Sequence, residues 1–120
     1  MIASIVHPAL AGHAPLAAIV GARIYRDYAG DAPVAPYVIW SDMVSVGSTS
    51  IARFKGYAER VSVTIDVFSL DRAQSETLRD AARDAAETIG KISSGPQNLG
   101  RDDATKLYRY TMTVDVFKTR

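Results

Sequence analysis

The sequence VTIDVF occupies residues 63–68, and the closely similar MTVDVF occupies residues 112–117. In both segments β-branched residues or methionine alternate with threonine, aspartate and phenylalanine, and this period of two is typical of a strand that buries one face. The sequences that flank the two copies do not match, so an ancient duplication is not needed to explain them. We therefore interpret the pair as two strands of one sheet, with the phenylalanines on its outward side.

Asp66 and Asp115 occupy the same position in the two segments, which raises the question of a catalytic pair of carboxylates. The pattern offers no third group that completes a nucleophilic or acid–base set, and nothing indicates the burial that would separate two carboxyl pKa values. Side by side in water, two carboxylates would repel each other by about 1 kcal/mol. We expect them to be solvated, offset or paired with cations, and we predict that the protein is not an enzyme.

The length and composition of the chain exclude several classes of protein and of functional site. The chain has 120 residues, 22% of them charged, a formal net charge of +1 and no cysteine. This length fits one domain over residues 1–120, while the absence of cysteine excludes disulfides, thiolate catalysis and cysteine-based zinc sites. The near-neutral charge argues against nucleic acid as the main ligand. The longest mostly apolar stretch, residues 14–22, is far shorter than the roughly 20 residues that span a bilayer, so a soluble intracellular product is expected.

Residues 71–90 give the strongest helical pattern. Asp71 is a plausible N-cap, Gln74 completes a capping box, and Gly90 is expected as the residue that ends the helix. The apolar stripe is formed by Leu78, Ala81, Ala82, Ala85 and Ile89. The opposite face is charged and is expected to be solvated.

The rest of the chain predicts short elements. Residues 4–20 contain Pro8, Gly12 and Pro15, which favours two short helical pieces over one long helix. Four strands are expected, at residues 23–28, 37–46, 60–69 and 106–119, with irregular loops at residues 47–59 and 93–104. Together these elements indicate an α+β fold in which the long helix and the short N-terminal pieces accompany a four-stranded sheet.

Other candidate sites are weak. His7 and His13 are six residues apart around a proline and a glycine, which does not place two imidazoles on one helical face, and no third metal ligand is evident. The stretch GSTSIARFKG, residues 47–56, has neither the spacing nor the flanking strand and helix of a phosphate-binding loop. No catalytic, cofactor or metal site is predicted.

Protein contacts are better supported. Phenylalanine at positions 68 and 117, on the outward side of two strands, implies that this side is covered, either by the N-terminal helical pieces or by another subunit. The segment 47–59 is long for a connector and is expected to project as an arm. Aromatic anchors and cations lie together in it, at Arg53, Phe54, Lys55 and Tyr57.

The order of these features carries a resemblance. In this order of features the chain resembles the tail completion or tail terminator proteins of long-tailed bacteriophages. This group includes the lambda-type tail terminator and related head–tail joining proteins. The features are an apolar start that ends in VGARIY, a proline-rich connector, PYVIW, a variable loop, RVSVTIDVFS, an alanine-rich helix and a closing YRYTMTVDVF. The resemblance covers nearly the whole chain. The chain departs from the family's pattern in its compact, proline-broken N-terminus and in residues 47–59.

The resemblance implies helices against a mainly antiparallel sheet and a ring, usually of six copies, at the head-proximal end of the virion tail. Such a ring stops growth of the tail tube and offers a docking surface to the head–tail connector. Genomic DNA passes through its lumen without specific binding. The resemblance implies no membrane contact, no catalysis and no cofactor. The alternatives are a neighbouring head-closure or adaptor protein, a small ligand-binding regulatory α+β domain, and an enzyme whose site is assembled between subunits.

Overall fold

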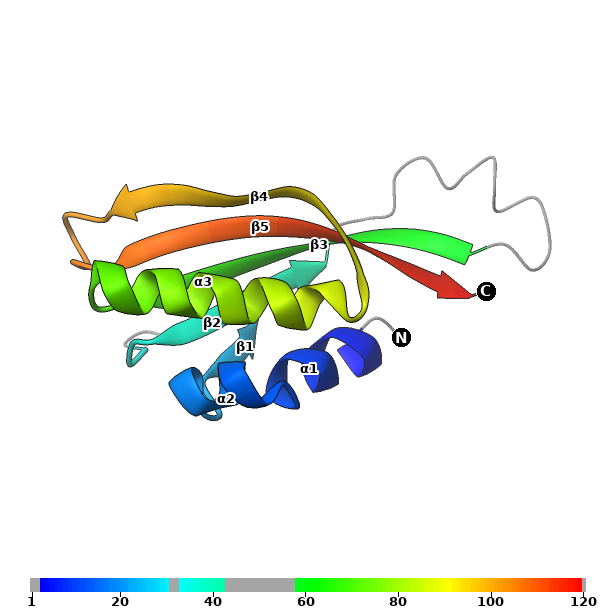
Figure 1. The fold of residues 1–120 in the computed structure, drawn as a ribbon, viewed down its shortest axis with the longest axis horizontal. Helices are drawn as coiled ribbons and strands as arrows, with labels where there is room; N and C mark the ends of the chain where they lie inside the picture. Colours follow the sequence, from blue (N-terminus) through cyan, green and yellow to red (C-terminus); the bar gives the residue numbers. More distant parts are fainter. Residues whose placement is uncertain (1–2, 31–32, 43–57, 120) are drawn as a thin grey trace.

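The two strands that contain the repeated hexapeptide form the centre of the sheet (Figure 1). The structure is a computed structural model that describes residues 3–30, 33–42 and 58–119. Strands β3 (Ala58–Ser69) and β5 (Tyr108–Thr119) pair antiparallel over twelve residues, and Val63 lies opposite Val114. The inward residues of the two hexapeptides therefore meet across the strands, as the alternation predicts.

Within these described residues the sheet has five strands rather than the four predicted. Its order is β1-β2-β3-β5-β4. Strand β2 (Tyr37–Asp42) is antiparallel to β3, and the short β1 (Ile24–Arg26) is parallel to β2, so the sheet is mainly antiparallel. The predicted strand over residues 37–46 is confirmed as far as Asp42, and its remainder lies outside the described residues.

The fifth strand is β4 (Gly90–Arg101), and it replaces the loop predicted at residues 93–104. It pairs with β5 at the edge of the sheet, but its register shifts between Ile92 and Ser94, between Ser94 and Gln97, and between Asn98 and Gly100. Bulges remove the alternation of apolar and polar residues that identifies a strand. Only the tight turn after Arg101 matches the loop prediction, with the Asp102 side chain accepting hydrogen bonds from Ala104 and Thr105.

Helix α3 (Arg72–Glu87) lies across β3, β4 and β5 as predicted. The Asp71 carboxylate accepts a hydrogen bond from the Gln74 amide at 2.7 Å, and the Gln74 side chain accepts one from the amide of Leu70 at 3.0 Å. Gly90 does not end the helix, because the C-cap is Thr88 and Gly90 begins β4. A side chain at position 90 would lie 2.2 Å from the Asp115 carbonyl oxygen, which explains the glycine.

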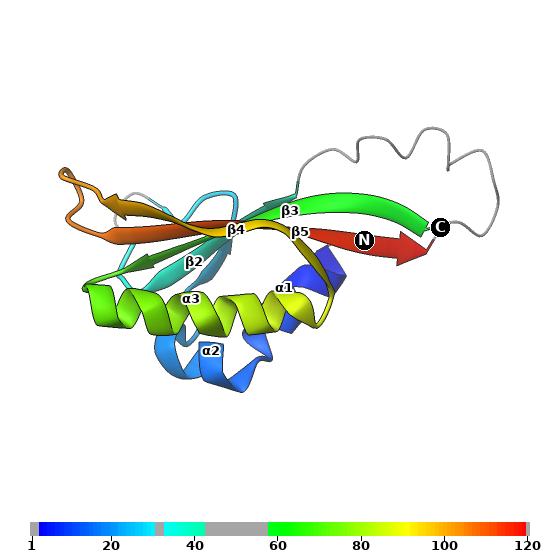
Figure 2. The same ribbon diagram turned by 45° about the horizontal axis from the view of Figure 1, so that its top comes forward.

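The two N-terminal helical pieces are α1 (Ala3–Ala11) and α2 (Ala14–Val20). Pro15 lies in the first turn of α2, whereas Pro8 lies inside α1, where the sequence argument did not place a proline. Both helices pack against α3 (Figure 2). Their apolar side chains join one core with those of the inward side of the sheet. The fully buried members include Val6, Leu10, Leu16, Val20, Val38, Trp40, Ile65, Leu78, Met112 and Val114.

The three helices in the described part of the chain therefore lie on the same side of the sheet (Figures 1 and 2). The suggestion that the N-terminal pieces cover the outward side is wrong, because α1 and α2 bury their apolar residues beside α3. No helix of the described residues lies over the outward side. Phe68 belongs to that side, because it alternates along β3 with the buried Val67.

Candidate functional site

Phe68 belongs to a cluster of side chains on the outward side of the sheet. The register places Tyr37, Phe68 and Arg109 in one row across β2, β3 and β5. The rings of Tyr37 and Phe68 are stacked with centroids 4.6 Å apart, Tyr25 meets Tyr37 edge-on at 6.3 Å, and the Arg109 guanidinium lies 5.3 Å from the Phe68 ring centroid. Asp66 anchors Arg109 through a 3.1 Å ion pair. We call these five residues the outward cluster.

The outward cluster is partly self-covered. Tyr37 is only 6% exposed, and Phe68 is partly buried. Burial raises the pKa of the Tyr37 hydroxyl, the Arg109 charge opposes this effect, and Tyr25 adds to it. Sequence reasoning found Phe68 but not Tyr25, Tyr37 or Arg109, because only strand register brings these residues beside Phe68.

The other predicted contact residues are less fully placed. Phe117 lies opposite Arg60 in the β3–β5 pairing, but its side chain is outside the described part of the chain. Arg53, Phe54, Lys55 and Tyr57 also lie outside the described residues. The structure therefore brings Phe68 together with partners from neighbouring strands and leaves the predicted arm as a prediction.

The two aspartates of the repeated segments do not form a pair. Asp66 lies opposite Thr111, and Asp115 lies opposite Ser62, so the carboxylates are four residues apart along β3, roughly 13 Å. Asp66 is paired with Arg109, and Asp115 accepts a hydrogen bond from the Ser62 hydroxyl at 3.0 Å. The expectation that they would be offset or paired with cations is confirmed.

The histidines lie apart from these aspartates. His7 on α1 accepts a hydrogen bond through Nδ1 from the Trp40 indole at 3.4 Å, and His13 is the N-cap residue of α2. Within residues 3–30, 33–42 and 58–119, no three His, Asp or Glu side chains are grouped so that they could hold a metal ion. No helix in this described part is long and apolar enough to cross a bilayer.

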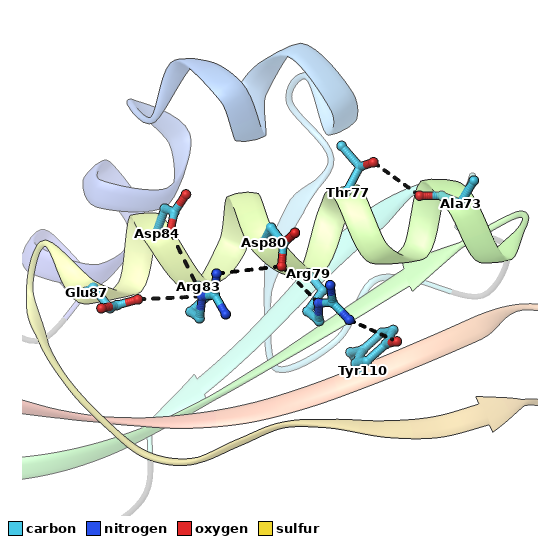
Figure 3. A network of polar contacts seen from close by, with 8 residues as sticks. All are labelled: Ala73, Thr77, Arg79, Asp80, Arg83, Asp84, Glu87 and Tyr110. Atoms are coloured by element: carbon cyan, nitrogen blue, oxygen red, sulfur yellow. Dashed lines mark hydrogen bonds and ion pairs between the residues drawn. The ribbon is translucent and has the colours of Figure 1, made fainter.

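The solvent-facing side of α3 carries a chain of ion pairs (Figure 3). Arg83 is shared by Asp80, Asp84 and Glu87 at 3.7, 4.0 and 3.6 Å. Arg79 donates to Asp80 at 2.9 Å and to the Tyr110 hydroxyl at 3.3 Å. The hydrogen bond from Arg79 lowers the pKa of Asp80, and these exposed pairs contribute little to stability because water screens them.

A shallow hollow lies where α2 meets the beginning of α3. Its volume is about 530 Å³, and it is lined by Ala18, Ile19, Asp71, Ala73, Gln74 and Thr77. The lining offers methyl groups and three polar side chains: Asp71 and Gln74 already serve the N-terminus of α3, and the Thr77 hydroxyl donates to the Ala73 carbonyl.

Comparison with protein families gives a match over residues 5–117 to the model described as tail completion protein gp17. The chain belongs to this family. As a member of the tail completion family it is a structural component of a phage-like virion, and a family of this kind does not usually supply enzymes.

The fold has a counterpart among solved structures. A chain from the virion of a native gene transfer agent particle superposes with a TM-score of 0.58 at 21% sequence identity, over 96% of this chain and 92% of that one. At this identity the likeness shows a shared fold. A comparison with curated proteins found no significant match.

Proposed function

We propose that this tail completion protein forms a ring, most simply of six copies, at the head-proximal end of the tail tube, where it stops tube growth and presents the surface that the head–tail connector docks onto. The observation that carries the proposal is the family match over 113 consecutive residues, 5 to 117. The proposal is also supported by the arrangement of the described residues, whose helices lie on one side of the sheet and leave the other side for contacts.

The proposed partners are further copies of this chain, the tail tube protein and the connector. The outward cluster, in which Phe68 is stacked on Tyr37, serves one contact. Residues Arg53, Phe54, Lys55 and Tyr57 are proposed to serve another, since aromatic anchors and cations are common at the centre of protein interfaces. DNA passes through the lumen without specific binding, because two cations per arm are too few to hold a duplex by counterion release.

Replacement of Phe54 and Tyr57 together by serine tests the second contact. We expect a melting temperature close to that of the wild type and a loss of tail termination, seen by electron microscopy as tubes of uncontrolled length or as tails without heads. Thr113→Ser, on the middle of β5, is the control and is expected to give normal particles. Normal infectious particles from the double variant would remove the arm from the docking surface.

A further inference from the structure

Both histidines of the chain lie on the N-terminal helical pair, His7 inside α1 and His13 at the residue before α2. The indole N–H of Trp40 donates to Nδ1 of His7 at 3.4 Å. An indole nitrogen can only donate, so Nδ1 must carry a lone pair and no proton. Trp40 is only 1% exposed, and a buried donor that loses its acceptor destabilises the fold. The contact between α1 and β2 therefore requires the neutral form of His7.

The surroundings of His13 also suit a neutral imidazole. Its Nε2 atom is buried and has no hydrogen-bond partner among the described residues. A second ring proton would make the imidazole cationic and leave a charged, buried N–H without an acceptor. His13 is moreover the N-cap residue of α2, where a positive charge opposes the helix dipole. Protonation of His13 therefore weakens the packing at the start of α2.

The carboxylates of the neighbouring helix are engaged elsewhere or face the solvent. α1 and α2 both pack against α3, whose buried side chains are all neutral. Asp80, Asp84 and Glu87 of α3 are paired with arginines of the same helix. Asp71, beside α2 in the hollow, caps α3, and Glu76 is exposed to solvent. α2 itself contains no titratable side chain.

On the sheet, the charged neighbours of Trp40 are Arg26 and Asp42. The Arg26 guanidinium lies 5.0 Å from the Trp40 ring centroid and forms an ion pair with Asp42 at 2.8 Å. Tyr25 and Tyr37, the tyrosines of β1 and β2, belong to the outward cluster on the other side of the sheet. In the part of the chain that the structure describes, no carboxylate forms an ion pair with either imidazole. A proton gained by an imidazole is therefore not stabilised by a direct ion pair.

We propose that these two histidines make the packing of the N-terminal helical pair sensitive to protons. As the pH falls through the range in which imidazoles titrate, about pH 8 to 5, α1 and α2 separate from Trp40 and α3 more often, while the sheet and α3 stay folded. The direction follows because the folded state uses the neutral imidazoles, so their contribution to stability is present at high pH and is lost on protonation. This device belongs to the single chain and does not depend on ring formation.

The buried apolar side chains of the helical pair keep the change small. Val6, Leu10, Leu16 and Val20 are fully buried, so the loss of one hydrogen bond and the addition of one unpaired charge do not detach the pair completely. A hydrogen bond of this kind changes an opening equilibrium roughly three- to tenfold. Acid therefore increases the population of the open form without unfolding the chain.

Amide hydrogen exchange of the purified full-length chain, followed by mass spectrometry and corrected for the intrinsic pH dependence of exchange, measures the opening. Between about pH 8 and about pH 5 we expect the protection factors of residues 3–20 to fall roughly three- to tenfold relative to those of α3 and β5. Trp40 is the only tryptophan of the chain, so its fluorescence emission should shift to longer wavelength over the same range.

Two substitutions remove the groups that bind protons and keep the contacts. In His7→Gln the amide oxygen can still accept from Trp40, and in His13→Asn the side chain suits an N-cap, but neither amide titrates. The double variant should show the same relative protection of residues 3–20 at both pH values, and His7→Gln alone should abolish the shift of Trp40 emission. Arg26→Gln, which removes the cation beside Trp40 and keeps both imidazoles, is the matched control and should respond to pH like the wild type.

A wild type with equal relative protection at the two pH values would overturn the proposal, as would a double variant that still responds. Loss of protection in α3 and β5 together with residues 3–20 would also overturn it, because global acid unfolding needs no local device. If the double variant does not fold, the two single variants decide, since each should respond less than the wild type.

Discussion

At the scale of single residues, Asp66 and Asp115 have the same place in the repeated segments but different surroundings. The Asp66 side chain is 18% exposed and forms an ion pair with Arg109. Asp115 instead accepts a hydrogen bond from the Ser62 hydroxyl, and the neutral amide of an asparagine could accept the same bond. We expect Asp66→Asn to cost about 1 kcal/mol of unfolding free energy and Asp115→Asn a few tenths. Urea denaturation of both variants measures the difference, and equal losses would contradict the assigned ion pair.

The raised pKa of the Tyr37 hydroxyl predicts that the stability of the fold changes at alkaline pH. Because burial raises its pKa above 10 in the folded state, the neutral hydroxyl stabilises the fold below the unfolded pKa, and this contribution is lost as the pH rises through the folded pKa. Tyr37→Phe cannot ionise, so the wild type should lose stability relative to this variant as the pH rises above the ordinary tyrosine pKa of about 10. Chemical denaturation at several pH values measures it, and parallel curves would exclude burial of the hydroxyl.

The composition of the outward cluster shows the limit of residue-level reasoning. Alternation alone placed Phe68 on the outward side, because a strand exposes every second residue. Tyr37 and Arg109 could not be found in the same way, since their contact with Phe68 depends on the register of β2 and β5 against β3. Nothing in the local sequence fixes that register.

At the scale of elements, periodicity identified those that bury one face. Helix α3, β3 and β5 were predicted because their buried residues recur with the helical or strand period and pack against one another. Strand β4 was missed because it is an edge strand whose residues are mostly exposed and whose register shifts three times. Sequence patterns record burial, and an irregular edge strand has little of it.

Substitution of Gly90 distinguishes its predicted role as the residue that ends α3 from its observed place as the first residue of β4. A helix-ending glycine with a left-handed backbone tolerates substitution at a cost of about 1 kcal/mol. Here a Cβ would approach the Asp115 carbonyl oxygen to 2.2 Å, so Gly90→Ala must displace β4 from β5 and should cost about 2 kcal/mol or more. Gly100→Ala, which has open space around a positive φ of 78°, is the control and should cost less. A smaller loss for Gly90→Ala than for Gly100→Ala would contradict this placement.

At the scale of the whole molecule, the family and the α+β class were both predicted from the order of the elements, and the match over residues 5–117 confirms the family. The arrangement of layers was not predictable, because the same amphipathic N-terminal pieces could cover either side of the sheet. Core contacts with α3 decided it. The result is a molecule measuring 47 × 27 × 25 Å, with the described helices on one side of the sheet. The strand registers place the outward cluster on the other side.

The central claim is that several copies of this chain close into a ring at the head-proximal end of the tail. A three-dimensional density map of assembled particles, obtained by electron microscopy with the symmetry of the tail end determined independently, tests it most directly. We expect a closed ring, most simply of six copies, between the last ring of tube subunits and the connector, with each copy in contact with two others. A single copy at that position, or none, would contradict the account.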